Sequence, residues 1–496
     1  MSHPEIMRAL SGLLLGMFTA ILSSTIVTNA LPRIIADLGG GQSAYTWVVT
    51  ATLLAMTASM PLWGKLADLY SKKLLIQTSL VIYIAGSLVA GLAQSPAMLI
   101  AVRVVQGLGV GGLVGLSQIV LAAMIPPRER GRYSGYLGAT FAAATVSGPL
   151  IGGLLTDGLG WRWCFYIGVP VALAALVVLQ RTLRLPVTRR EVRIDWPGAL
   201  LVSAAVSLLL VWVTLAGDRY AWASWQTAAM VGGSLALAAL FLAVEARASD
   251  PIIPLRLFRD PTIALASGAS LLVGVAMFSG TVFFSQYFQL ARGDSATMSG
   301  VLTIPLIAGL VLSSTVSGQF ITRTGRWKNW LVAGGVLVTA GMGLLGTTRH
   351  DTPYVRLALF MALMGLGLGA LLQNLVLATQ NRVGPRDLGA ASSVVAFFRS
   401  FGGALGVSAL GALLAARVAD YTREGVAGLG AGAGGAAQAP EGSIPDPERL
   451  PAPLRAVIEN AYGHGIGDIF LYAAPTALLA LLIILGIKET ALRTRL

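Results

Sequence analysis

Long apolar runs alternate with short polar segments along the whole chain. A helix crosses about 30 Å of hydrocarbon with about 20 apolar residues, because it rises about 1.5 Å per residue. The first run begins close to Met1 without an obvious small-residue cleavage site, which favours a retained helix over a removed signal peptide. We predict fourteen membrane-spanning helices, at about 8–31, 45–66, 74–94, 97–124, 133–156, 162–180, 197–216, 226–245, 262–290, 297–321, 330–347, 355–380, 389–416 and 468–487.

The composition supports an all-α polytopic membrane protein. Of 496 residues, 55% are hydrophobic and 11% are charged, whereas soluble domains carry about 25% charged residues. The net charge of +13 does not indicate nucleic acid, since Lys and Arg lie between the apolar runs rather than in a patch with aromatic residues. One cysteine, Cys164, excludes an internal disulfide, and no His/Cys/carboxylate cluster has metal-ligand spacing. We expect no cofactor, no metal and no nucleic-acid partner.

The basic residues predict the orientation. If both termini are cytoplasmic, the inner segments carry 23 Lys and Arg and the outer segments carry 10. Cytoplasmic loops of membrane proteins hold such an excess of positive charge. This assignment requires an even number of spans. We therefore predict a multi-pass protein with both termini in the cytoplasm, and the Ala/Gly/Arg-rich composition suggests a bacterial plasma membrane.

A weak internal repeat divides the chain. The turn GKLADLYSKK (64–73) after the second run has an eroded counterpart, GQFITRTGRWK (318–328), after the tenth. Such repeats are typical of transporters whose site lies at the midplane between two halves. We predict an N-terminal six-helix bundle (1–185), two inserted linker helices (186–260) and a C-terminal six-helix bundle (261–496) with a mobile, Gly/Ala-rich outer loop at about 417–467.

Two arginines, Arg103 and Arg399, lie deep within apolar runs, and no Asp or Glu lies in the middle of any run. A charge at bilayer depth costs about 2.5–3.5 kcal/mol on insertion scales, and it usually lines a cavity. Gln106 follows Arg103 by three residues and so shares its helix face. Arg103, Gln106 and Arg399 are therefore candidates for substrate binding or coupling. The alternative is an arginine that only holds helices together.

The turn at 64–73 is a candidate conformational element. Gly64 allows two helices to approach closely. Asp68 can accept hydrogen bonds from a helix N-terminus of the other half, where the helix dipole favours an anion. Lys72 and Lys73 complete the basic end of the turn. The alternative is a solvated turn whose positive charge only sets the topology.

The fifth run contains GATFAAATVSGPLIGG (138–153). Pro149 lacks a backbone donor and should kink the helix. Gly148 and Gly152, four residues apart, present a flat face for close packing, and Gly153 adjoins it. These residues are candidates for conformational change, and a generic packing helix is the alternative.

Polar residues in other runs are candidates for the substrate site. Ser23 and Asn29 belong to a polar strip in the first run, although hydroxyls there can instead bond back to their own helix. In the second half, Gln289 and Asn374 could reach a central cavity. Phe398 lies beside Arg399, but aromatic side chains at such positions more often face lipid or core.

Together these motifs resemble the major facilitator superfamily, and more narrowly its fourteen-span drug:proton antiporter branch, over essentially the whole chain. The resemblance implies the major-facilitator fold. It also implies that the 64–73 turn is a latch, that Arg103 takes part in proton coupling, and that Gly148 and Pro149 belong to the antiporter signature.

The first run departs from the family pattern. The segment ILSSTIVTNALP (21–32) has Ser23 where the family carries a membrane-embedded aspartate, and Thr28 where it carries asparagine. Serine does not titrate near neutral pH, so the proton-carrying role of that aspartate does not extend to Ser23. Asp37, Asp68 and Asp157 are the remaining titratable candidates.

We expect a monomeric secondary exporter of amphipathic small molecules, such as drugs or antibiotics, that works by alternating access. The resemblance implies proton antiport. The buried cations favour a neutral or anionic substrate. The alternative is a facilitator without proton coupling, or an exporter of a neutral or anionic metabolite. A membrane enzyme would need a nucleophile, a metal cluster or paired acids within the spans, and none is visible. A lipid scramblase is a third class that a fluorescent-lipid assay would distinguish.

Overall fold

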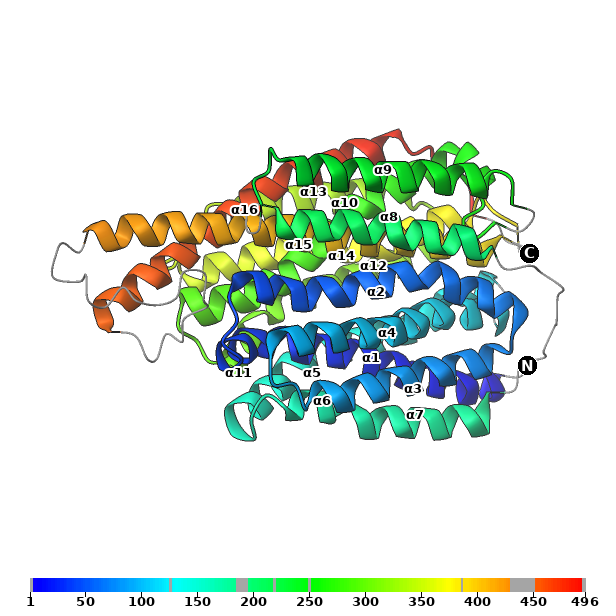
Figure 1. Ribbon diagram of the computed structural model, residues 1–496. Coiled ribbons are helices and arrows are strands. Elements are labelled where there is room, and N and C mark those ends of the chain that lie inside the picture. Colours follow the sequence, from blue (N-terminus) through cyan, green and yellow to red (C-terminus); the bar gives the residue numbers. More distant parts are fainter. Residues whose placement is uncertain are drawn as a thin grey trace.

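The computed structural model describes residues 3–124, 127–183, 195–216, 220–248, 251–384, 387–428 and 451–492. Apart from an isolated bridge between Ala216 and Tyr220, the regular structure in these ranges is helical. The long helices run side by side in one bundle (Figure 1). The all-helical prediction is therefore confirmed.

The helices follow one another in a simple order. The first part of the chain forms α1 (His3–Asp37), α2 (Gln42–Leu69), α3 (Lys72–Ala90), α4 (Pro96–Met124), α5 (Pro127–Gly158), α6 (Trp163–Tyr166) and α7 (Gly168–Thr182). Two helices follow, α8 (Trp196–Leu215) and α9 (Trp225–Glu245). The last part forms the 3-10 helix η1 (Leu255–Arg259), α10 (Pro261–Gln286), the π-helical turn η2 (Tyr287–Ala291), α11 (Ala296–Leu302), α12 (Ile304–Thr324), α13 (Lys328–Leu345), α14 (Tyr354–Gln380), α15 (Leu388–Gly428) and α16 (Ala452–Gly486).

The helices have the length and composition of membrane spans. Within the described residues, 13 candidate spans are long and apolar enough to cross a bilayer. Helix α5 is more polar, because its first turns carry charged residues, but it runs alongside the others (Figure 1). The start of α1 and the end of α16 lie at the same end of the bundle, which we call the termini end (Figure 1). Both chain ends lie at one end of the bundle only if the chain crosses it an even number of times. Counting α5 with the 13 candidate spans gives fourteen.

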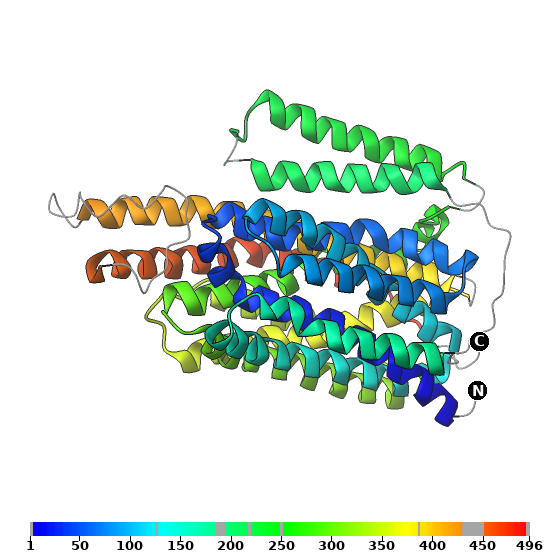
Figure 2. The same ribbon diagram turned by 60° about the horizontal axis from the view of Figure 1, so that its bottom comes forward.

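The spans form two six-helix bundles and an extra pair. In the first bundle, α1 packs on α5 and α7, and α4 packs between α2 and α3. In the second, α10 packs on α15 and α16, while α14 packs on α12 and α13. Helices α8 and α9 pack on each other and stand to one side of both bundles (Figure 2). Helix α8 touches α2 of the first bundle and α15 of the second, so the pair bridges them.

Helices α15 and α16 extend past the other helices at the opposite end of the bundle (Figure 1). The sequence predicts a loop at 417–467, but 417–428 and 452–467 are helical, so the predicted loop is wrong there. Polar contacts hold these extensions together: Tyr421 donates a 2.8 Å hydrogen bond to Asp468. The pattern of apolar residues does not predict these extensions, because they lie beyond the apolar runs and are held by polar contacts. Residues 429–450 lie outside the described ranges.

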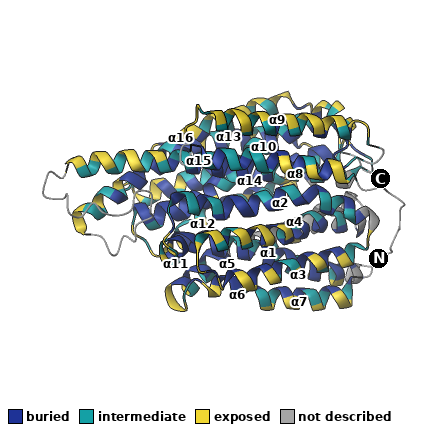
Figure 3. Cartoon of the chain, viewed as in Figure 1, coloured by how far each residue is buried: buried dark blue, intermediate teal, exposed yellow. Residues whose placement is uncertain are grey.

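Burial follows the bundle geometry (Figure 3). Buried residues face the neighbouring helices, whereas the outer faces of peripheral helices are exposed and apolar. Leu92, Leu200 and Trp225 have exposed fractions of 63%, 68% and 76%. Apolar surface this extensive marks contact with a membrane. The prediction of a multi-pass membrane protein is supported by this distribution.

Candidate functional site

A cavity of about 720 Å³ lies between the two bundles, including the space where it opens to its surroundings. Helices α1 and α5 of the first bundle and α10, α12 and α14 of the second form its wall. No ionisable side chain is among the described residues that line it. These residues are hydroxyl-bearing, amide or apolar: Thr25, Thr28, Asn29, Thr145, Pro149, Met277, Gly280, Thr281, Ser285, Thr303, Leu306, Ile307, Leu310 and Leu368.

The hydroxyl groups of the cavity wall donate hydrogen bonds to nearby backbone carbonyls. Thr28 donates to the carbonyl of Ser24 at 2.8 Å, Thr281 to Met277 at 3.0 Å and Thr303 to Gly300 at 2.8 Å. A hydroxyl that donates in this way keeps lone pairs that can accept hydrogen bonds. The wall can therefore accept hydrogen bonds from a bound molecule while its apolar part contacts Met277 and Leu306.

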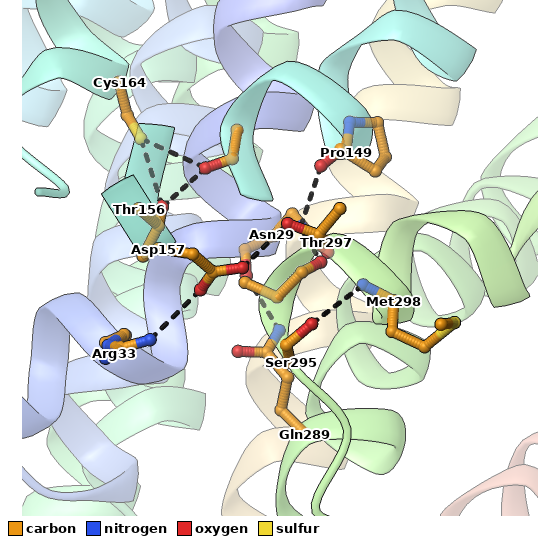
Figure 4. A network of polar contacts seen from close by, with 12 residues as sticks. Asn29, Arg33, Pro149, Thr156, Asp157, Cys164, Gln289, Ser295, Thr297 and Met298 are labelled. Carbon is orange, nitrogen blue, oxygen red and sulfur yellow. Dashed lines mark hydrogen bonds and ion pairs between the residues drawn. The ribbon is translucent and has the colours of Figure 1, made fainter. Parts of the chain in front are cut away.

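Asn29, which lines the cavity, links α1 to α5 and α11 (Figure 4). Its side-chain amide donates to the carbonyl of Pro149 in α5 at 3.3 Å and to that of Ala296 in α11 at 2.7 Å. The amide of Gln289 in η2 donates to the Asn29 carbonyl at 2.8 Å and to Ser285 at 2.9 Å. Asn29 and Gln289, both candidates from the sequence, thus meet across the two bundles.

Asp157 forms the next layer of contacts (Figure 4). Its carboxylate pairs with Arg33 of α1 at 3.1 Å and accepts a 2.7 Å hydrogen bond from Thr297 of α11. A Cβ at Gly153 would overlap the backbone of Thr297, so α5 and α11 are in backbone contact. Asn29, Gln289, Arg33, Asp157 and Thr297 together form what we call the polar seal.

A second set of contacts continues the closure on the α2 side. The amide of Gln286 donates to the side-chain carbonyl of Gln42 at 2.5 Å. The Tyr45 hydroxyl donates to the backbone carbonyl of Val282 at 3.1 Å. Both contacts join α2 of the first bundle to α10 of the second. Besides the polar seal, these contacts between α2 and α10 therefore also hold the two bundles together.

Arg103 lies inside the first bundle, 4% exposed, and does not line the cavity. It donates to Gln106 at 3.1 Å, and Gln106 donates to Ser87 at 2.9 Å. The Tyr83 hydroxyl faces Arg103, Ser23 and Ser87. Within the described part of the chain, no carboxylate forms an ion pair with Arg103. Arg103 and Gln106 do share a face, as their spacing predicts.

The candidates in the second bundle lie apart from Arg103. Phe398 packs edge-to-face on Phe258 and on Phe397, with centroid distances of 6.0 and 5.5 Å. Asn374 donates to the carbonyl of Ala370 in its own helix at 2.7 Å. Arg399 forms no ion pair with any described residue. None of these residues lines the cavity.

The motif glycines differ in their surroundings. A Cβ at Gly64 would meet Ser393 at 3.7 Å, an ordinary contact, so alanine would fit there, and the role of Gly64 in conformational change stays a prediction. In α5, a Cβ at Gly148 would overlap Thr25, and one at Gly152 would lie 3.0 Å from the Ile26 carbonyl. Helices α1 and α5 are therefore packed too closely for larger side chains at these two positions.

The basic turn is only partly described. Lys73 donates a 2.6 Å hydrogen bond to the backbone carbonyl of Gln180 at the end of α7. Lys72 is half-buried at the first position of α3. The side chain of Asp68 lies outside the described residues, so its predicted role as an acceptor stays a prediction.

Sequence reasoning missed several wall and seal residues. Thr145, Thr281 and Thr303 are isolated hydroxyls in separate runs, and Thr297 lies at the start of α11. The local sequence around each of them is ordinary. The signal is missing because the cavity is formed by side chains from five separate helices. Only the packing of α1 and α5 against α10, α12 and α14 brings them together.

Comparisons with known proteins agree with this architecture. The sequence profile of the Major Facilitator Superfamily matches residues 13–407. An MFS-type transporter of Mycobacterium tuberculosis, Rv1877, is 35% identical over 97% of this chain and 69% of its own length. Multidrug resistance protein 3 of Bacillus subtilis is 32% identical over 97% of this chain and 95% of its own length.

A solved structure shares the fold at low identity. The bacterial homologue of the human lysosomal transporter Spinster, in an inward-facing and occupied conformation, superimposes with a TM-score of 0.66 and 16% identity over 98% of this chain and 97% of that chain. The prediction of a transporter rather than an enzyme is confirmed by the family match. By its profile, its relatives and its two-bundle fold with a central cavity, the chain belongs to the major facilitator superfamily.

Proposed function

We propose that this transporter exports uncharged amphipathic small molecules across the bacterial plasma membrane by alternating access. The observation that carries this proposal is the cavity between the bundles, whose described lining residues include no ionisable group. A preformed apolar pocket with a few polar groups suits a small amphipathic ligand. The relation to Multidrug resistance protein 3 supports the exporter class.

The polar seal supports an assignment of the conformation. The seal lies between the cavity and the opposite end, and it joins α1 and α5 to η2 and α11. The distribution of Lys and Arg favours a cytoplasmic termini end. With that orientation, the seal closes the cavity to the outside, and substrate reaches the cavity from the cytoplasm or the inner leaflet.

The placement of the buried arginines bears on the substrate's charge. Both Arg103 and Arg399 lie outside the cavity wall, so neither guanidinium is positioned to pair with an anion there. A lipophilic cation would also lack a counter-charge in the wall. An uncharged molecule avoids the cost of bringing an unpaired charge into an apolar site. Hydroxyl or amide donors on the substrate would match the acceptors on the wall.

Since the described lining residues do not titrate, proton coupling would use a group elsewhere in the chain. Ser23 does not titrate, and the described lining offers no carboxylate. Asp157 is the best-placed candidate, because it joins α1 to α11 through Arg33 and Thr297. A proton on Asp157 would weaken the pair with Arg33 and so favour opening of the seal. The absence of a carboxylate in the described wall keeps an uncoupled facilitator as the second candidate.

A transport assay tests the substrate class. The full chain is expressed in a host that lacks its own efflux pumps, and accumulation is measured for an uncharged dye and for ethidium, a lipophilic cation. We expect reduced accumulation of the uncharged dye only. Export of ethidium by the wild-type chain would contradict the proposed substrate class.

A further inference from the structure

Two carboxyl groups meet where the inserted pair begins and ends, at the termini end of the bundle. Asp195 caps the N-terminus of α8, and its Oδ1 accepts a 2.9 Å hydrogen bond from the backbone N–H of Gly198. Glu245 is the last residue of α9, and its Oε1 accepts a hydrogen bond from the backbone N–H of Ile253. One oxygen of each carboxyl therefore accepts a hydrogen bond from a backbone N–H.

The second oxygens have no such role. Asp195 Oδ2 and Glu245 Oε2 are both buried and form no hydrogen bond with any described residue. Glu245 is only 2% exposed. A Cβ at Gly198 would overlap both oxygens, so the two atoms lie close together over this glycine. The free oxygen of each carboxyl thus faces the other carboxyl.

No cation compensates the pair within the described part of the chain. Neither carboxyl forms an ion pair. Among titratable groups, Asp195 is the one that interacts electrostatically with the carboxyl of Glu245. Among the described residues, the other charged groups on the elements nearby are Lys65 of α2, Arg247 after α9, Arg256 and Arg259 of η1, and Asp260 and Asp387; Arg256 pairs with Asp387, and Asp260 pairs with Arg382. Arg193, two positions before Asp195, lies outside the described ranges.

Glu245 is buried and Asp195 is half-buried, and no described cation pairs with either. Two carboxylates that face each other in this way repel each other, so such pairs bind a proton instead. A single proton also gives both unsatisfied oxygens a hydrogen-bond partner, since the protonated carboxyl donates its O–H to the other carboxylate. We propose that Asp195 and Glu245 bind one shared proton near neutral pH. This site lies outside the transport cavity, and the inference does not depend on the substrate.

The shared proton would hold three segments together. Asp195 starts α8, Glu245 ends α9, and Ile253 belongs to the segment that leads into η1 and the second bundle. Helix α8 in turn packs on both bundles. On release, the proton passes to water and leaves two carboxylates that repel each other across Gly198. The junction of the inserted pair with the second bundle therefore loosens as the pH on this side rises.

Infrared spectroscopy of the purified full chain tests the proton directly. We expect the C=O stretching band of a protonated carboxyl at neutral pH, and its loss in both Glu245→Gln and Asp195→Asn. Loss in both single variants is the signature of one proton shared by two groups. A wild-type spectrum that lacks this band, or that neither variant changes, would overturn the proposal. A band that appears only when Mg²⁺ is removed would also overturn it, because the pair would then bind a cation.

Thermal unfolding across pH supplies a second measurement. From about pH 6 to about pH 9, the unfolded chain holds no proton on these carboxyls, whereas the folded pair does until it is released. The melting temperature of the wild type should therefore fall as the pH rises through the release. Glu245→Gln should remove this component, because its amide donates to Asp195 at any pH and its carbonyl still accepts from Ile253.

Matched variants keep this measurement interpretable. Glu459→Gln alters a carboxyl that pairs with Arg455 in α16, so it should retain the wild-type pH dependence. If Glu245→Gln fails to fold, Asp195→Asn carries the same test, since its side-chain carbonyl can still cap Gly198. Identical pH dependence in the wild type and both pair variants would contradict the shared proton.

Discussion

The side-chain amide of Asn29 in α1 donates a 2.7 Å hydrogen bond to the backbone carbonyl of Ala296 in α11, 267 positions further along the chain. Asn29 is 4% exposed, and the same amide also reaches the carbonyl of Pro149 in α5. One side chain therefore joins three helices from both bundles. Any movement that opens the cavity toward the opposite end has to break these hydrogen bonds.

Asn29→Ala should weaken the seal. Removing one partner leaves buried carbonyls unsatisfied, at a cost of about 1–3 kcal/mol, which is enough to shift a conformational equilibrium by about tenfold. The measurement uses Thr28→Cys, in a chain whose Cys164 is replaced by Ala, and a thiol reagent that cannot cross the membrane. We expect faster labelling from outside in Asn29→Ala. Asn374→Ala is the control, because among the described residues Asn374 donates to the carbonyl of Ala370 in its own helix. Equal labelling in both variants would contradict the role of Asn29.

The wall hydroxyls should contribute to binding of uncharged substrates. Thr281→Val removes an acceptor from the cavity while it keeps the side-chain volume. A typical hydrogen bond contributes about 0.5–1.5 kcal/mol, so we expect about a two- to tenfold rise in KM for export of a neutral donor-bearing compound. Thr379→Val is the control, since Thr379 donates to Leu375 and does not line the cavity. An unchanged KM for Thr281→Val would place the substrate elsewhere.

Gly153→Ala should obstruct closure of the seal. The added methyl group would overlap the backbone of Thr297, and backbone cannot move aside as a flexible side chain can. We expect a loss of about 1–3 kcal/mol of stability and slower transport. Gly158→Ala, on the same helix with nothing within 4 Å of the new Cβ, is the matched control. Wild-type transport and stability in Gly153→Ala would show that α5 and α11 need not touch.

Asp157→Asn tests coupling at the seal. The asparagine carbonyl can still accept the Thr297 hydrogen bond, but the ion pair with Arg33 is lost. In proteoliposomes, we expect the substrate-driven change of lumenal pH to disappear while substrate exchange persists. Asp420→Asn, which breaks an exposed ion pair with Arg423, should leave the pH signal intact. A pH signal that survives in Asp157→Asn would exclude this carboxyl as the coupling group, and robust transport without any pH signal in the wild type would favour the facilitator.

Ser23→Asp should stabilise the first bundle without changing the substrate. Ser23 lies beside Tyr83, which also faces Arg103, and Ser23 does not line the cavity. Arg103 forms no ion pair with any described residue. A carboxylate there can pair with Arg103 and relieve an uncompensated buried charge. We expect a melting temperature higher by roughly a few degrees and no gain of ethidium export. Ser279→Asp, at another buried hydroxyl, should destabilise instead; ethidium resistance in Ser23→Asp would show that position 23 reaches the substrate.

The apolar runs by themselves determined the all-helical class, and the Lys and Arg distribution gave an orientation that requires an even number of spans. These features are local, because each span needs only its own length and hydropathy to enter a membrane. The spacing of Arg103 and Gln106 likewise predicted a shared helix face, which the structure contains. Local pattern failed for the ends of α15 and α16, where polar contacts such as Tyr421 with Asp468 extend the helices beyond the apolar run.

The tertiary structure alone decided which polar residues act together. Asn29 and Arg103 are both candidates from the sequence, yet Asn29 bonds to Pro149 and Ala296, while Arg103 bonds to Gln106 within the first bundle. The same holds for Asp195 and Glu245, which are the start of one helix and the end of the next. A helix gives every side chain a direction, but the partner in that direction depends on how helices from distant parts of the chain pack. The sequence therefore determined the spans and the family, and packing decided the cavity, the seal and the carboxyl pair.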